Sequence, residues 1–526
     1  ALTSRWQQCT RAAMPAPSMT DANPPAASAS HRVARGIGTT VLARLGALVE
    51  IVAQPLYVLM FGLTGYGLHA VLWAAINLAE NIFDLGMTSA LQRTVPRSAD
   101  DAEAAIALRT ALLLGVGPCL IIAIIVAAAA PQLAPLVNVA AADADRVVPA
   151  IQLFIWALPL WAFVEIATSA LRARMLFGAE IRLRIFWEQL IRLALAAMLF
   201  AAGWGLMSLF AAHLASLAIT AALSVRLLAR HYDLRLMLRS GWPSVARDTA
   251  LAGLSVLPSN LVARLYGDAP TLLLNQMLPG AAGAAAGGLF TIARKLSSVV
   301  QLVRTAFVHV LAPLAASSER HDRAEVQEIY AFAVRLITVL ALPLAAVLAA
   351  GAGKLLTLFG PGAGVAEAAV ITLFMARAAE AVLGISVPVL QVVAAFRHQL
   401  AASIAGLAAA LVTGMLLSDL LAPLTAVTLA VAAGLITSAA IPLAQLWRVE
   451  ALHPFTAAFP RVLAVALAVA AGGSALMLLA ARLADAIALV LLVVIALASL
   501  WVSLRFALPR ADRQSLGKAG RALRLG

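Results

Sequence analysis

The chain alternates long apolar runs with short polar connections, and a run of about 20 apolar residues is long enough to cross a bilayer as an α-helix. The pattern predicts six spans, then six more, then a final pair, at about 38–62, 67–90, 106–130, 148–171, 183–203, 206–229, 249–275, 284–312, 328–352, 365–395, 398–418, 423–446, 458–481 and 484–507. The sequence therefore predicts an all-α polytopic membrane protein of about 14 transmembrane helices, with two pseudo-symmetric six-helix lobes plus a C-terminal helix pair.

These spans divide the chain into six parts. In order, we expect a disordered cytoplasmic tail, an N-terminal six-helix lobe, a cytoplasmic connecting segment, a C-terminal six-helix lobe, an extra helix pair and a basic cytoplasmic tail, at 1–36, 37–230, 231–248, 249–447, 448–508 and 509–526. The first part is rich in Ala, Ser and Pro and has no apolar core of signal-peptide length, which is why we expect it to be disordered.

The two lobes resemble copies of one repeat. A shift of 221 residues superposes GYGLHAVLWAAINLAENIFDLGMTSALQRTVP on AGGLFTIARKLSSVVQLVRTAFVHVLAPLAAS and places Gly67 on Gly288. Many transporters consist of two repeats with the substrate site at the interface between them. The repeat therefore predicts a site between the lobes.

Composition and charge support the membrane class. With 63% hydrophobic and 12% charged residues, the chain could not cover a soluble surface. The formal net charge of +13 comes mostly from short connections that fall on one side of the membrane in this topology, among them those with Arg93 and Arg97. The positive-inside rule then predicts that both termini are cytoplasmic. It also accounts for the net positive charge, so nucleic-acid binding is not needed to explain that charge. The two cysteines, Cys9 and Cys119, argue against a disulfide framework or a cysteine-ligated metal cluster.

The segment Gly283–Pro313 is apolar enough to span a membrane, yet it carries three fixed positive charges. Each such charge at the centre of a span costs roughly 2.5 to 3.5 kcal/mol, so these residues usually face a protein interior or a wet cavity. Steps of three and four residues form one stripe of the helix, with Lys295 beside it: Arg294, Ser297, Ser298, Gln301, Arg304 and Thr305. Arg294 and Arg304 would stand about 15 Å apart along the helix. Such a row of cations predicts an anionic passenger.

A second polar stripe occupies the matching position of the first repeat: Asn77, Glu80, Asn81 and Asp84. Polar residues in spans either hydrogen-bond neighbouring helices or line a functional cavity. Because exposure of two carboxylates to lipid would be prohibitive, we expect Glu80 and Asp84 to lie in a water-accessible cavity across from the basic helix.

Other charges within spans leave alternatives open. Arg264 and Asp268 lie one helical turn apart, so they either neutralise each other or contact substrate, and Glu50 in the first span is a further candidate. Arg294 is either an internal ion-pair partner or a substrate ligand. Two further pairs are predicted to be structural: Glu188 with Arg192, and Arg377 with Glu380.

No motif of an enzyme or a nucleotide site is found. The histidines His69, His213, His309 and His398 lack metal-ligand spacing. The segment GPGAG at 360–364 lacks the Lys-Ser/Thr of a phosphate loop. We therefore expect no cofactor, no metal and no enzymatic activity, and transport driven by an H+ or Na+ gradient, by removal of substrate or by a partner.

The segment MFGLTGYGLHAVLWAAINLAENIFDLGMTSALQRTVP resembles the start of the polysaccharide-biosynthesis flippases of the O-antigen (Wzx) type. Its Gly-Tyr-Gly entry to the second span and its close around Asp84, Gly86 and Arg93 are similar to the pattern of that family. The later segment LLLNQMLPGAAGAAAGGLFTIARKL is similar to another family pattern, with Phe290 where a Tyr is common. The resemblance covers about residues 36–450.

The resemblance implies the multidrug/oligosaccharidyl-lipid/polysaccharide (MOP) exporter fold, with two lobes in a V and alternating access. It implies a bacterial inner-membrane flippase that carries a polyprenyl-pyrophosphate-linked oligosaccharide between membrane leaflets, with glycosyltransferases and a polysaccharide polymerase as partners. The pyrophosphate ligands would be Arg264, Arg294, Lys295, Gln301 and Arg304, with Arg44 near the cytoplasmic entrance. The candidates for sugar contacts or for binding of a coupling H+ or Na+ are Glu50, Asn77, Glu80, Asn81, Asp84 and Asp268.

Two alternatives remain at this stage. The nearer is another transporter of the same fold, either a peptidoglycan-precursor flippase or a drug/ion antiporter. The more distant is a membrane polysaccharide polymerase or ligase. Such an enzyme needs a substantial outer loop for acceptor sugars, and the longest predicted outer connection is about 131–147.

Overall fold

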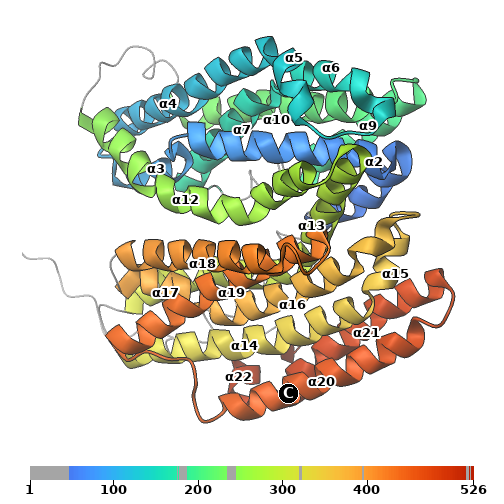
Figure 1. The fold of residues 1–526 in the computed structure, drawn as a ribbon. Coiled ribbons are helices and arrows are strands. Elements are labelled where there is room, and N and C mark those ends of the chain that lie inside the picture. The colour runs from blue at the N-terminus through green and yellow to red at the C-terminus, as the bar shows by residue number, and fades with distance from the viewer. Residues whose placement is uncertain are drawn as a thin grey trace, which may run out of the picture.

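The computed structural model describes residues 47–174, 176, 186–233, 244–318, 323–393, 396–516, 520–521 and 523–525. Every regular element of these residues is a helix, and the helices form two lobes joined by long central helices (Figure 1). The predicted all-α class is confirmed. The expected tail at 1–36 and the candidate ligand Arg44 lie outside the described residues.

The N-terminal lobe contains eight α-helices and three short 3-10 turns among the described residues. They are α2 (Ala47–Phe83), α3 (Met87–Thr94), η1 (Val95–Arg97), α4 (Asp101–Ala128), α5 (Ala130–Leu133), η2 (Ala134–Leu136), η3 (Ala141–Asp143), α6 (Ala144–Phe154), α7 (Ala157–Ala173), α9 (Glu188–Ala201) and α10 (Met207–His231). Two long helices, α12 (Ser244–Met277) and α13 (Gly280–Ser318), then lead into the second lobe.

The C-terminal lobe consists of α14 (Arg323–Ala350), α15 (Ala352–Thr357), η5 (Ala363–Ala366), α16 (Glu367–Leu383), α17 (Ser386–Val393), α18 (Phe396–Leu417) and α19 (Pro423–Glu450). The extra pair is α20 (Phe459–Ala480) and α21 (Asp485–Phe506), followed by α22 (Arg510–Ser515). The extra pair packs along α14, on the side of this lobe away from the N-terminal lobe (Figure 1).

Where they fall on described residues, the expected spans coincide with helices, but several boundaries differ from those expected. The first two spans run together as α2, which is kinked at Gly62, where φ is 71°. The span expected at 148–171 is divided between α6 and α7. Among the described residues, nine helices are long and apolar enough to cross a membrane, and α12 and α13 are not among them.

The two lobes contact each other at the two glycines that the repeat aligns. Gly67 of α2 lies against α13, so closely that a Cβ on Gly67 would stand 2.0 Å from the carbonyl oxygen of Ala284. A Cβ on Gly288 would in turn stand 3.1 Å from the Gly67 Cα. The two glycines that the repeat aligns therefore touch each other, as expected for equivalent positions beside a pseudo-two-fold axis.

This contact yields a stability prediction. We expect Gly67→Ala to destabilise the protein by about 1 to 3 kcal/mol or more, because the new methyl group would overlap backbone that cannot move aside as a side chain can. Thermal unfolding of the purified protein in detergent measures this loss. Gly117→Ala is the matched control, since a Cβ there meets no atom within 4 Å, and it should leave stability unchanged or raise it. Equal melting temperatures for the two variants would contradict the close contact.

Part of the C-terminal segment, which was expected to be a basic tail, packs against the C-terminal lobe. Asp512 of α22 is buried and accepts two hydrogen bonds from Arg335 of α14, at 2.6 and 2.9 Å. Arg513 donates to the carbonyl oxygens of Arg505 and Leu525. These contacts fold the segment against the lobe, and they could not be predicted from the sequence because 177 residues separate Arg335 from Asp512.

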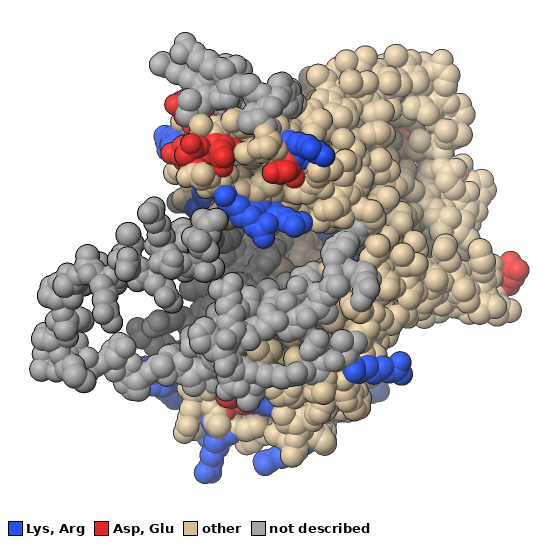
Figure 2. Space-filling model, turned by 90° about the vertical axis from the view of Figure 1, so that its left-hand side faces the viewer, with Lys and Arg blue, Asp and Glu red and all other residues tan. Residues whose placement is uncertain are grey.

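Basic residues gather at one end of the helix bundle, the end at which η1 lies and α12 begins. Figure 2 shows this end face with its Lys and Arg side chains. The opposite end carries α5 and α15 (Figure 1). This distribution agrees with the predicted alternation of basic and non-basic connections, and the positive-inside rule predicts that the basic end is the cytoplasmic one.

The orientation can be tested with two exposed alanines at opposite ends of α4 and its extension. We expect a membrane-impermeant maleimide to label Ala141→Cys in intact cells but to leave Ala99→Cys unlabelled until the membrane is permeabilised. Both positions are exposed in the structure. The two variants should therefore differ in labelling only because the membrane keeps the reagent away from one of them. Both variants also carry Cys9→Ser, so that the reagent cannot label Cys9. The remaining native cysteine, Cys119, is buried. Labelling of Ala99→Cys in intact cells would reverse the topology.

Candidate functional site

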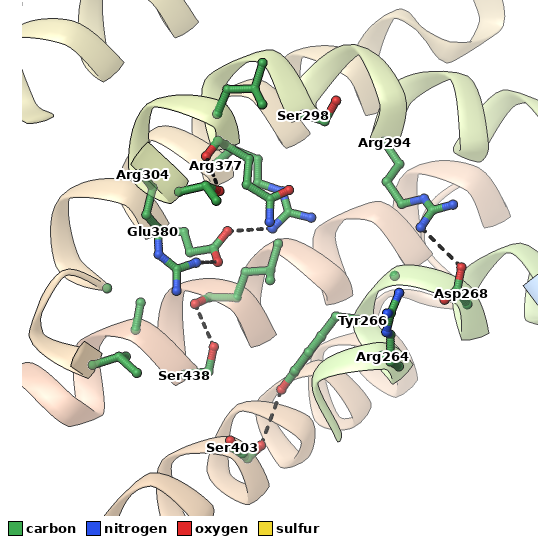
Figure 3. Close-up of a pocket in the computed structure, with 18 of the residues that line it drawn as sticks. Arg264, Tyr266, Asp268, Arg294, Ser298, Arg304, Arg377, Glu380, Ser403 and Ser438 are labelled. Carbon is green, nitrogen blue, oxygen red and sulfur yellow. Dashed lines mark hydrogen bonds and ion pairs between the residues drawn. The ribbon is translucent and has the colours of Figure 1, made fainter. Parts of the chain in front are cut away.

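A cavity of about 650 Å³ lies at the centre of the molecule. Side chains of α12, α13, α16, α17, α18 and α19 line it, and Glu50 of α2 reaches it from the N-terminal lobe. Figure 3 shows that its charged side chains converge on it from helices that are distant in sequence. A concave site with few but well-placed charged groups is the usual form of a ligand-binding site.

The polar stripe of α13 lines this cavity for most of its length. The lining residues of α13 include Arg294, Lys295, Ser298, Gln301, Arg304 and Thr305. The exception is Ser297, which is fully buried and donates a hydrogen bond to the carbonyl oxygen of Arg294 at 2.9 Å. The helical periodicity of these residues predicted that they share one face of α13, and in the structure this face forms one wall of the cavity.

One charged cluster lies between α2, α12 and α13. Arg294 donates to Asp268 of α12 over 3.2 Å, and Lys295 donates to Glu50 of α2. The Asp268 side chain is only 1% exposed, whereas that of Arg294 is 21% exposed. Arg294 thus neutralises a buried carboxylate and still presents part of its guanidinium to the cavity.

A second cluster lies farther along α13. Arg304 and Arg377 both donate to Glu380 of α16, one to each carboxylate oxygen, with 2.6 Å between Arg377 and Glu380. The predicted pairing of Arg377 with Glu380 is confirmed, as is that of Glu188 with Arg192. We expected Arg377 and Glu380 to form a structural pair only. In the structure both residues also line the cavity beside Arg304.

Arg264 of α12 differs from the other cations of the cavity. The sequence left open a pair between Arg264 and Asp268, but Asp268 pairs with Arg294 instead. Among the described residues, Arg264 has neither an ion pair nor a hydrogen-bond partner, and its guanidinium points into the cavity beside Tyr266 (Figure 3).

The described lining carries more positive than negative charge. It contains five cations, Arg264, Arg294, Lys295, Arg304 and Arg377, and three carboxylates, Glu50, Asp268 and Glu380. The difference is a formal charge of +2. Because the three carboxylates are already paired with cations, the excess is available to an anionic ligand.

The acidic stripe of the first repeat lies elsewhere. Glu80 and Asp84 are 3% and 5% exposed, and they are not part of the lining of the cavity. Asn81 donates to Glu80 at 2.8 Å, and Asn77 is buried beside it. The prediction that these carboxylates face the basic helix across one cavity is wrong. The physical reason is that α2 turns its glycine face toward α13, so its acidic face points into the N-terminal lobe.

Two of the histidines that lack metal-ligand spacing in the sequence lie together in the structure. The Nε2 atom of His69 lies 3.0 Å from Nδ1 of His213, inside an aromatic cluster with Trp73, Phe154 and Phe210. Only their positions in the fold reveal this contact, since 144 residues separate them. Among the described residues, no three His, Cys, Asp or Glu side chains form a group that could hold a metal ion.

A sequence-family model described as "Polysaccharide biosynthesis protein" matches residues 61–360. The chain belongs to this family. The match includes all of α12 and α13, and therefore four of the five cations that line the cavity. The family resemblance expected from the sequence is confirmed at this level. A comparison with curated proteins finds no match.

Solved structures with the same fold are transporters of the MOP superfamily. The lipid II flippase MurJ, in an inward closed conformation, aligns with a TM-score of 0.66 and 10% identity over 88% of this chain and 97% of its own. A multidrug resistance MATE transporter in an inward-facing conformation aligns with a TM-score of 0.60 and 16% identity over 80% and 94%. A Vibrio cholerae MATE transporter aligns with a TM-score of 0.61 and 15% identity over 80% and 98%. This member of the polysaccharide biosynthesis family is therefore a multi-pass membrane protein with the fold of those transporters.

Proposed function

We propose that this protein is a flippase of the bacterial inner membrane, which moves a polyprenyl-pyrophosphate-linked oligosaccharide from the cytoplasmic to the outer leaflet by alternating access. The observation that carries the proposal is the net positive cavity with Arg264, which pairs with no described residue. A pyrophosphate that links a lipid to a sugar is a diester with about two negative charges, and it would balance a formal charge of +2. Membership of the polysaccharide biosynthesis family supports a glycan as the rest of the substrate.

The arginines suit this headgroup in geometry as well as in charge. A guanidinium can donate two parallel hydrogen bonds to oxygens of one phosphate, which an ammonium group cannot do. Arg264 has no partner among the described residues and can do so, and the side chain of Arg294 is partly exposed. The cavity is also lined by the hydroxyl and amide groups of Tyr266, Ser403, Ser438 and Gln399, which are of the kind that hydrogen-bond sugars. The polyprenyl tail can stay among the membrane lipids.

The same cavity argues against a drug/ion antiporter, and the short outer connection argues against a polymerase or ligase. An antiporter of organic cations would need a neutral or negative site, because like charges in a site of low dielectric repel strongly. A polymerase or ligase would need an outer domain to hold an acceptor. The described connection between α4 and α6 holds only short turns, α5, η2 and η3. In our proposal the protein is a transporter and not an enzyme, supplied by glycosyltransferases and followed by a polymerase.

Binding measurements on the purified protein in detergent test the proposal. We expect polyprenyl pyrophosphate to bind more tightly than polyprenyl phosphate, and polyprenol to bind weakest, with an affinity for the pyrophosphate that falls as salt is raised. An organic cation such as ethidium serves as the control and should not compete. Equal affinity for the pyrophosphate and the neutral alcohol, or strong competition by ethidium, would contradict the proposed function.

A further inference from the structure

A second cavity lies at the basic end of the helix bundle, and we call it the end pocket. Its volume is about 570 Å³, and residues of α3, η1, α4 and the start of α12 line it. None of its described lining residues lines the central cavity. The spans expected from the sequence end at 90 and begin again at 106 and 249, so the end pocket should lie at the level of the lipid headgroups on the cytoplasmic side.

The end pocket carries charged side chains of both signs. Two cations and two carboxylates line it: Arg93 of α3, Arg97 of η1, Glu103 of α4 and Asp248 of α12. Figure 2 shows acidic as well as basic side chains on this end face. Among the described residues, the side chains of Arg93, Arg97 and Asp248 have neither an ion pair nor a hydrogen bond, although they share one pocket. The two positive and two negative charges sum to zero, but the arginines and the carboxylates do not neutralise one another by direct contact.

Apolar side chains of α12 also line the end pocket, namely Val245, Leu251 and Ala252. Leu251 is 53% exposed, and Leu254, about one turn farther along α12 into the expected span, is 49% exposed. A charged pocket with an exposed apolar surface beside it suits an amphipathic molecule at the membrane surface.

The charges of the end pocket discriminate among the headgroups of membrane lipids. A guanidinium donates paired hydrogen bonds to phosphate oxygens, so Arg93 and Arg97 suit a lipid phosphate. Glu103 accepts the backbone N–H of Ala99 with one carboxylate oxygen, at 2.7 Å, whereas no described residue engages the carboxylate of Asp248. A purely anionic headgroup would be repelled by these carboxylates, and an ammonium group would be attracted to them. A headgroup with both a phosphate and an ammonium group therefore matches the pocket best.

We propose that the end pocket binds one zwitterionic phospholipid of the cytoplasmic leaflet, with a headgroup of the phosphatidylethanolamine type. Arg93 and Arg97 hold the phosphate, Asp248 accepts hydrogen bonds from the ammonium group, and an acyl chain lies along Leu251 and Leu254. The bound lipid bridges the N-terminal lobe and α12, the helix that carries Arg264 into the central cavity. This lipid is resident and is not transported, so the inference does not depend on the proposed flippase function.

Native mass spectrometry of the purified protein tests this site, because it counts bound lipids and distinguishes them by mass. When phosphatidylethanolamine and phosphatidylglycerol are offered at equal concentration, wild type should retain one phosphatidylethanolamine about fivefold more tightly than phosphatidylglycerol. The variant with Arg93→Gln and Arg97→Gln should lose this tightly held lipid. Both arginines are exposed, so the melting temperature of the variant in lipid-free detergent should equal that of wild type.

A change of lipid preference separates binding from damage to the fold. Asp248→Asn gives the pocket a positive formal charge, so it should still retain a lipid but should now prefer phosphatidylglycerol. The matched control is Arg226→Gln with Arg230→Gln, since these arginines also lie one turn apart and exposed, at the C-terminal end of α10, and do not line the pocket. This control should retain phosphatidylethanolamine as wild type does.

Three results would overturn the inference. Equal retention of the two lipids by wild type, or the same loss in the control variant, would show that the charges of the end pocket are only solvated. An unchanged preference in Asp248→Asn would remove the carboxylate from the site. Displacement of phosphatidylethanolamine by an equal concentration of polyprenyl pyrophosphate would show that the pocket holds the transported lipid and not a resident one.

Discussion

Arg264→Gln is expected to weaken binding of polyprenyl pyrophosphate by about 10- to 100-fold, the loss of about 1.5 to 3 kcal/mol that accompanies removal of one hydrogen bond to a charged group. The same change should leave the free energy of unfolding within about 0.5 kcal/mol of wild type, because Arg264 neutralises no carboxylate among the described residues. Titration of the purified protein with the lipid, together with thermal unfolding, measures both quantities.

Two variants sharpen this prediction. Arg264→Lys should recover only part of the affinity, since an ammonium group keeps the charge but not the paired donors. Arg146→Gln is the control for loss of an arginine, because Arg146 is exposed in a connection away from the cavity. Wild-type affinity in Arg264→Gln, or the same loss in Arg146→Gln, would show that the unpaired arginine is not the ligand.

Arg294→Gln is expected to behave differently and to destabilise the protein by about 3 kcal/mol. The reason is that Asp268, with a side chain 1% exposed, would lose its counter-charge, and removal of one partner of a buried pair leaves an uncompensated charge. The sequence left two roles open for Arg294, an ion-pair partner or a substrate ligand. In the structure Arg294 pairs with Asp268 and also lines the cavity, so its position suits both roles. Thermal unfolding in detergent should show a lower melting temperature and cell extracts a lower abundance.

A double variant separates the two roles of Arg294. Arg294→Gln combined with Asp268→Asn removes both charges, so the stability should return most of the way to wild type. Binding of the pyrophosphate should not return, since the partly exposed guanidinium is still missing. A double variant that regains both stability and binding would reduce Arg294 to a structural residue.

The architecture and the basic wall of the cavity could be predicted from the sequence because both depend on local periodicity. Apolar runs gave the spans, and steps of three and four residues collected Arg294, Gln301 and Arg304 on one face of α13, where they line the cavity. The aligned glycines Gly67 and Gly288 even anticipated a contact. These features are properties of single helices or of a repeat, which a sequence records directly.

The partners across the cavity could not be predicted in the same way. The sequence offered Arg264, one turn away, as a partner of Asp268, yet Asp268 pairs with Arg294 of the next helix. Glu380 was assigned to Arg377 alone, yet it also binds Arg304. The face that α2 turns toward α13 decides where Glu80 and Asp84 lie, and that choice follows from the glycine contact and not from the helical period of the polar residues. Pairings between helices depend on tertiary packing, and polarity within one helix does not encode them.

The most direct test of the cavity as a substrate path is transport in proteoliposomes. The purified protein is reconstituted with a fluorescent polyprenyl-pyrophosphate disaccharide, and the fraction reached by a membrane-impermeant quencher is followed over time. Wild type should equilibrate the probe between leaflets much faster than protein-free vesicles do. The variant with both Arg264→Gln and Arg304→Gln should fall to the protein-free rate while remaining folded, because Glu380 keeps Arg377 as its partner. Wild-type rates in this variant, or no acceleration by folded wild type, would contradict the account.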